Sequence, residues 1–163
     1  MPDSFSAQDL PSPERYQEFV RDVELRGVRL LNCEVTSHGM LHESMQASYD
    51  LDVESTFAWI EQGFEAVQEC TVSVFVQEDE EAVPVGSINV AYGFVYSCTF
   101  EDEEYDRDAY LQIFQRVSLP VNAWPFIRQF VHDMTQRMNW PALTLPLLKP
   151  DEDASEQELG EAE

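Results

Sequence analysis

The chain has 163 residues, which is the length of one domain. Because 44% of them are hydrophobic and 12% aromatic, the chain can form a packed core, and disorder throughout is excluded. Its 32 acidic residues outnumber 9 basic ones, and the net charge of −23 repels nucleic-acid phosphates and anionic membrane surfaces. The charge therefore excludes direct nucleic-acid binding and favours a basic partner or simple solubility.

The sequence carries no sign of a membrane span or of a signal peptide. No segment approaches the roughly 20 consecutive apolar residues of a span, and residues 1–11 lack a basic start and an apolar run. We expect a cytoplasmic protein with no membrane insertion, a flexible N-terminus over 1–11, a single domain over 12–150 and a disordered acidic tail over 151–163. Three cysteines without paired spacing are expected to be buried free thiols: Cys33, Cys70 and Cys98.

The N-terminal residues have the pattern of a helix start. Ser12 can cap a helix, Pro13 fits its first position, and Glu14 suits the positive end of the helix dipole. Apolar residues at helical spacing then predict a helix over 13–26 that Gly27 ends. Tyr16, Phe19, Val20 and Val23 form this apolar stripe.

Four strands are predicted in the middle of the chain. Apolar and β-branched residues predict strands over 28–35 and 46–53. Alternation, interrupted at Gln68 in one segment and at Val95 in the other, predicts two longer strands over 64–77 and 87–100. The segment 55–63 fits both a short helix and a hydrophobic crossover loop, so both remain open.

Two helices are predicted to follow the strands. Helical spacing of apolar residues predicts one over 105–117 and a second over 122–138, which Asn122 caps. Strands followed by helices indicate an α+β fold, with helices packed on one face of a four-stranded antiparallel sheet. The apolar segment 143–148 must cover another apolar surface, because its exposure would create a sticky patch.

The C-terminal third carries prolines, aromatic residues, arginines and leucines at regular spacing. Its residues are Pro120-Val121-Asn122-Ala123-Trp124-Pro125-Phe126-Ile127-Arg128, then Met134 and Arg137, then Trp140-Pro141-Ala142-Leu143-Thr144-Leu145. This pattern resembles the SecB family of preprotein-export chaperones, in which a P-x4-P-aromatic-x-Arg helix start is followed by an Arg near the helix end and an aromatic-Pro-x-Leu-x-Leu exit. Upstream, the strand 28–35 and the pair Val90 and Gly93 follow the family's order.

The resemblance implies a non-enzymatic chaperone assembled as a homotetramer, a dimer of dimers. Such proteins hold unfolded preproteins in hydrophobic grooves and pass them to the SecA motor for translocation. The basic tail of SecA docks on an acidic sheet surface of the chaperone. Glu34 falls on one acid of that docking surface, while His38 and Asn89 fall where the family has two others. The N-terminal helix is an addition to the family pattern, and the family's short last helix is replaced by Lys149, Pro150 and the acidic tail.

Aromatic side chains are the candidates for client binding, because they offer large contact areas without strict sequence requirements. Ordinary core packing is the favoured alternative for most of them. Trp59 and Phe57 lie in the segment 55–63, for which both a short helix and a crossover loop remain possible. Trp59 is the better candidate for a residue that lines a client groove. The others are Tyr92, Phe94, Tyr96, Trp124 and Phe126.

The sequence contains no constellation for catalysis and implies no cofactor. Cys33, His38 and His42 carry possible metal-ligand atoms, but Gly39 removes the helical face that would bring both histidines together, so no metal site is predicted. His132 is predicted to face solvent. The leading hypothesis is a SecB-like holdase. The alternatives are a SecB-like chaperone of a toxin–antitoxin pair, or an acidic adaptor that mimics a polyanion for a basic partner.

Overall fold

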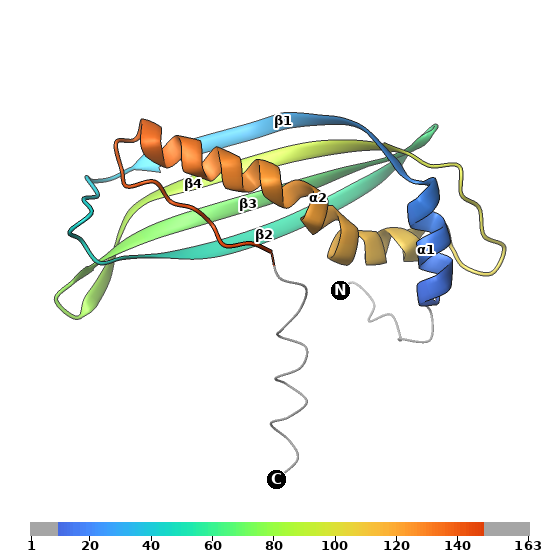
Figure 1. Cartoon of the computed structure of the whole chain (residues 1–163), viewed down its shortest axis with the longest axis horizontal. Helices are drawn as coiled ribbons and strands as arrows, with labels where there is room; N and C mark the ends of the chain where they lie inside the picture. Colours follow the sequence, from blue (N-terminus) through green and yellow to red (C-terminus); the bar gives the residue numbers. More distant parts are fainter. Residues whose placement is uncertain (1–9, 149–163) are drawn as a thin grey trace, which may run out of the picture.

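The computed structural model describes residues 10–148 as a four-stranded antiparallel sheet with two helices, the longer of which covers one face (Figure 1). This is the α+β fold that the order of patterns predicts. The elements are α1 (Pro13–Asp22), β1 (Glu24–Ser37), β2 (Ala47–Ile60), β3 (Gly63–Glu78), β4 (Glu81–Ser97) and α2 (Arg107–Arg137).

The strands lie in the order β1-β4-β3-β2, so β1 and β2 form the two edges of the sheet. Along β3, from Phe64 to Val76, buried side chains alternate with half-buried ones. The buried set faces α2, and the other set faces away from the helices. The sheet therefore has one covered apolar face and one open face.

The first helix is shorter than predicted. It starts at Pro13, where the Ser12 hydroxyl accepts a hydrogen bond from the Arg15 amide, but it ends at Asp22 rather than Arg26. Residues from Glu24 onward pair with the end of β4 instead. Because this pairing satisfies their backbone groups in a sheet ladder, tertiary structure overrides the local helical pattern.

The segment 55–63 is neither a helix nor a crossover loop, so both predictions for it are wrong. Residues 55–60 complete β2, which pairs with β3 along its whole length, and a tight turn leads directly into β3. Gly63 is needed at this turn, because a Cβ atom there would lie 1.9 Å from the Tyr96 carbonyl oxygen.

The two predicted C-terminal helices form one continuous helix, α2, which includes Pro120 and Pro125. Each proline leaves one carbonyl of the preceding turn without its helical partner, at Arg116 and Val121. Both of these residues are exposed, so water can satisfy the two carbonyls. Asp106 caps the helix. Asn122 does not cap it and donates instead to the Tyr96 hydroxyl at 3.0 Å.

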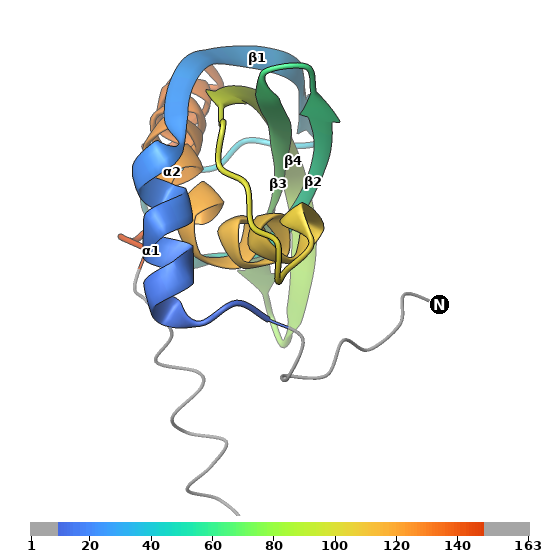
Figure 2. The same ribbon diagram turned by 90° about the vertical axis from the view of Figure 1, so that its right-hand side faces the viewer.

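The helix α1 lies at the end of the sheet beside the N-terminal part of α2 (Figure 2), and an aromatic cluster holds it there. Phe19 is 1% exposed and its ring centroid lies 5.2 Å from that of Tyr110 and 6.2 Å from that of Phe114. The Asp22 carboxylate accepts hydrogen bonds from the Thr99 and Phe100 amides at 2.6 and 2.8 Å. The added N-terminal helix is therefore part of the core.

Within residues 10–148, no helix combines the length and the apolar character needed to cross a bilayer. The predicted flexible N-terminus and disordered acidic tail fall almost wholly outside the described residues.

Candidate functional site

The long helix α2 presents different side chains to its two flanks. Phe126 points toward β4, the neighbour of the edge strand β1, and its ring centroid lies 5.7 Å from that of Tyr92 and 5.9 Å from that of Phe94. Trp124 and Arg128 face the other flank, where they bind the backbone of residues 145–146. The flank on the β1 side is open, whereas the chain itself fills the flank on the β2 side.

An exposed apolar surface lies along the open flank. Leu30 pairs with Tyr92 on the helix-facing side of the sheet, and Tyr92 contacts Phe126. Leu30 is 47% exposed and Phe126 39%, so large apolar groups face solvent. We call this region the β1-side apolar surface. Its residues are Leu25, Val28, Leu30, Cys33 and Val35 of β1, Tyr92 of β4, and Phe126 and Phe130 of α2.

The predicted aromatic residues divide between this surface and the core. Tyr92 is half-buried and Phe126 exposed, so both can be reached from solvent. Phe94 and Tyr96 are 0% and 2% exposed, beneath α2. These two would contact a client only if α2 moved. For them the structure agrees with the alternative of core packing.

Trp59 and Phe57 lie on β2 rather than on a loop, and their side chains face the N-terminal part of α2. The Trp59 indole donates to the Asp108 carboxylate at 2.6 Å, and the Arg107 guanidinium lies 4.5 Å from its ring centroid. Both aromatic residues are half-buried and pack against the core. Trp59 therefore fixes the start of α2, which the sequence pattern did not indicate.

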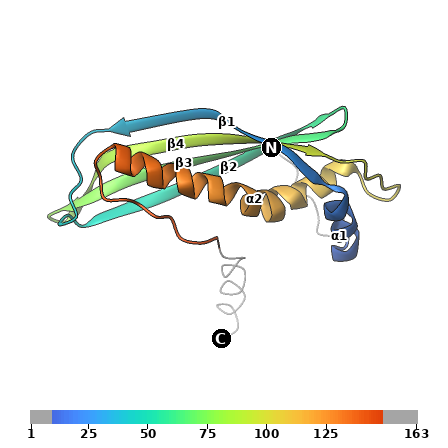
Figure 3. The ribbon, with the colours of Figure 1, turned by 45° about the horizontal axis from the view of Figure 1, so that its top comes forward.

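The closed flank of α2 is filled by residues 141–148, which we call the strap. The strap turns back after α2 and runs along the helix on its β2 side (Figures 1 and 3). Leu145 is fully buried, as expected of an apolar segment that covers another apolar surface. Leu147 and Leu148 are 71% and 41% exposed, so only part of the strap is covered.

Side chains of α2 hold the strap mainly by its backbone. The Trp124 indole donates to the Pro146 carbonyl and the Arg128 Nε to the Leu145 carbonyl, both at 2.8 Å. The Leu143 amide donates to the Thr135 hydroxyl at 3.0 Å. One side-chain contact joins His132 Nδ1 to the Thr144 hydroxyl at 3.3 Å.

The sequence reasoning missed this set of contacts. His132 lies at the surface, as predicted, but it is only partly exposed and contacts the strap, which the prediction did not include. Trp124 was expected on the apolar stripe but lies beside it, half-buried. The spacing of Trp124, Arg128 and His132, four residues apart on one helix face, was the available signal.

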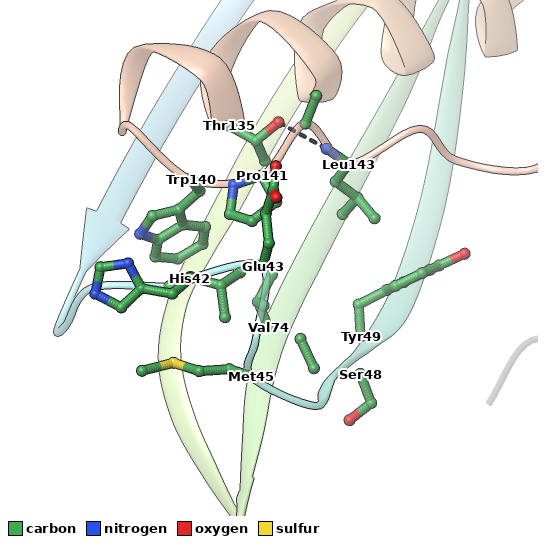
Figure 4. Close-up of a pocket in the computed structure, with 13 residues that line it drawn as sticks. His42, Glu43, Met45, Ser48, Tyr49, Val74, Thr135, Trp140, Pro141 and Leu143 are labelled. Carbon is green, nitrogen blue, oxygen red and sulfur yellow. Dashed lines mark hydrogen bonds between the residues drawn. The ribbon is translucent and has the colours of Figure 1, made fainter.

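A cavity of about 290 Å³ lies where the strap begins (Figure 4). Thr135 of α2, Leu143 of the strap and Trp140 between these two elements line it on one side, and Tyr49 of β2 and Met45 of the loop before β2 line it on the other. Apolar atoms contribute most of its wall, so the cavity suits an apolar side chain.

The open face of the sheet is acidic. Glu54 of β2 lies directly opposite Glu69 of β3, and Asp52 follows on the same side of β2. Glu34, the SecA-docking candidate, is exposed on this face and pairs with Asn89. The Asn89 amide donates to the Glu69 carboxylate at 2.8 Å. The face therefore presents carboxylates from three strands and is suited to a basic partner.

The three cysteines have different environments, and none forms a disulfide. Cys33 is exposed on the edge strand β1, so the expectation that it is buried is wrong. Cys70 is buried, and this burial, together with the nearby Asp52 charge, raises the pKa of its thiol to about 11. In residues 10–148, no three metal-ligating side chains lie close enough together to hold an ion.

Comparison with known proteins yields a structural relationship and no sequence relationship. No family model matches the chain, and no curated protein matches it. The solved structure of a Mycobacterium tuberculosis SecB-like chaperone, Rv1957, is similar with a TM-score of 0.68 at 20% identity. The match covers 84% of this chain and 99% of that one. The chain has a SecB-like fold.

That neighbour was solved in complex with a ChAD peptide from the Rv1956 HigA1 antitoxin. A protein of unknown function from Streptococcus agalactiae matches with a TM-score of 0.33 at 12% identity, over 77% of this chain and 97% of that one.

Proposed function

We propose that this protein is a SecB-like molecular chaperone that holds unfolded client polypeptides without catalysing a reaction. The observation that carries the proposal is the β1-side apolar surface, where Leu30 and Phe126 remain about half exposed although they border the core. Exposed apolar patches of this kind mark sites of interaction with apolar partners. The SecB-like fold supports the proposal, since a neighbour with this fold was solved with a bound peptide.

We place the protein in the cytoplasm, where its three free thiols would stay reduced. Its clients are unfolded preproteins or, as for the structural neighbour, the peptide of an antitoxin. The acidic open face with Glu34 supports docking of the basic tail of SecA. Titration calorimetry with a SecA tail peptide tests this step, and Glu34→Gln should weaken the binding. The absence of binding at low salt would leave the chaperone of a toxin–antitoxin pair as the favoured role.

A homo-oligomer, proposed as a tetramer, would cover part of the exposed apolar surface. Leu31 of β1 lies outside the β1-side apolar surface and is 44% exposed on an unpaired sheet edge, which is an unfavourable arrangement for an isolated subunit. Sedimentation at micromolar concentration should give about four times the subunit mass of 18.8 kDa. A species of the subunit mass alone would contradict this part of the proposal.

Light scattering of an aggregating client tests the chaperone role directly. A reduced, unfolded client diluted into buffer should scatter less light when an equimolar amount of this protein is present. The protection should persist at 0.5 M salt, since screening weakens surface charge attraction but not apolar contacts. Protection only at low salt would favour the acidic adaptor, and no protection at any salt would contradict the chaperone role.

A further inference from the structure

The closed flank of α2 is built to bind a polypeptide backbone. Trp124, Arg128 and Thr135 each direct a polar side-chain atom at a main-chain group of residues 143–146. These side chains lie on one face of the helix, so they can contact main-chain groups at successive positions of an extended chain. Carbonyl groups are present in every peptide, and such contacts therefore impose almost no sequence requirement.

One side-chain position adds selectivity to this backbone contact. Leu145 is fully buried in the hydrophobic core, whereas Leu147 and Leu148 face solvent. The cavity of about 290 Å³ beside Leu143 offers room for a further apolar side chain. The flank thus fits an extended segment with leucine-like residues at alternate positions, since alternate side chains of an extended chain point the same way.

We propose that this flank of α2 is a second client-binding surface, which the strap occupies in the free chain as an intramolecular competitor. An extended apolar segment of a client displaces residues 143–146 and takes over their hydrogen bonds to Trp124, Arg128 and Thr135. This inference rests on the proposed function and names the site and the chemistry of its ligand.

The contacts of the strap are suited to exchange. The bonds from Trp124 and Arg128 are replaced by equivalent bonds to client carbonyls, and the bond to the Thr135 hydroxyl by one from a client amide, so the net change for the polar groups is small. The strap is attached directly to α2, and its effective concentration at the site is in the millimolar range or above. A client segment must therefore outcompete a tethered ligand, which makes the site selective for strongly apolar segments.

A reversible lock on the strap tests the inference in the full chain. His132 and Thr144 touch at 3.3 Å, so we replace both by cysteine in a Cys33→Ser background and compare the oxidised and reduced protein. The probe is a fluorescein-labelled peptide with the sequence of residues 141–148, followed by fluorescence anisotropy. A peptide with serine in place of every leucine is the control.

The reduced protein should bind the labelled peptide at least tenfold more tightly than the oxidised protein, and the serine peptide should bind to neither. In a second variant, Leu145→Ser should loosen the strap and raise the affinity at least tenfold above that of the unmodified chain. Val20→Ser, at an exposed position of α1 outside the contacts of the strap, should leave peptide binding within twofold.

Equal binding by the oxidised and reduced proteins would overturn the inference, as would a folded Leu145→Ser variant with unchanged affinity. Circular dichroism shows whether Leu145→Ser folds. If it does not fold, the peptide affinities of the oxidised and reduced double-cysteine protein are sufficient to test the inference. The chaperone role is measured separately by client scattering with the unmodified chain. Protection in that assay together with equal peptide binding would show that only the second surface is wrong.

Discussion

Replacing Phe126 by serine should remove client holding while leaving the protein folded. Phe126 is 39% exposed, so somewhat more than half of its side chain is buried against Tyr92 and Phe94. Full burial of such a side chain contributes about 1.5–3 kcal/mol, and its partial loss should cost about 1–2 kcal/mol. This is a modest part of a typical stability of about 5–15 kcal/mol.

Phe94 provides the contrasting substitution in the same aromatic group. It is 0% exposed, and Phe94→Ala should cost about 3–5 kcal/mol because it leaves a cavity beneath α2. Val121→Ser is the control for exposure alone. Val121 is 61% exposed on the same helix but lies on another side of it, about 140° from Phe126. We expect this control to leave both stability and client holding nearly unchanged.

Urea denaturation followed by circular dichroism measures the stability of the three variants, and light scattering of an unfolded client measures holding. Interface aromatics often contribute most of the binding energy, so Phe126→Ser should reduce the protection at least severalfold. A folded Phe126→Ser variant that protects as well as the unmodified protein would refute the assignment of the β1-side apolar surface as the client site.

Three further predictions concern stability and reactivity. Phe19→Ala should lower the free energy of unfolding by about 3–5 kcal/mol in urea titrations, because its buried ring joins α1 to the core; a loss below 1 kcal/mol would contradict this. Hydrogen bonds, chiefly from the Thr99 amide, lower the pKa of Asp22. The ionised Asp22 carboxylate should therefore stabilise the fold at pH values above its ordinary pKa of 3.8, and this stabilisation should be lost as the pH falls through the lowered pKa. Asp22→Asn should therefore reduce stability at pH 7 by about 1 kcal/mol and flatten the acid decline, and an unchanged acid decline would contradict that reasoning. A thiol reagent should modify exposed Cys33 in the folded chain, while Cys70, whose pKa burial raises to about 11, should react only in urea; equal labelling of both by mass spectrometry would refute the assignment.

For the proposed client site, the sequence predicted the type of residue, aromatic side chains, but not which of them are exposed. Aromatic residues at alternate positions of β4 were recognisable from the sequence, and Tyr92 and Phe126 do meet at an exposed surface. That Phe94 and Tyr96 are buried instead depends on where α2 crosses the sheet. The contacts of Arg128 and His132 with the strap were equally hidden, because they require the chain to fold back along the helix.

The sequence by itself determined the sheet and its covered face. Side chains alternate along β3 and β4 with a period of two, and this local pattern must bury one face whatever the rest of the chain does. The helix start at Ser12 and Pro13 was equally local, because a cap acts within one turn.

Only the tertiary structure decided where elements end or join. Residues 55–60 extend β2 because β3 lies beside them, and α2 passes through Pro120 and Pro125 because one continuous apolar stripe is buried on the sheet. In each case the deciding free energy comes from residues distant in the chain, and it outweighs a local preference of at most a few kcal/mol. A pattern within one segment cannot contain that contribution, since the partners that supply it meet only in the folded protein.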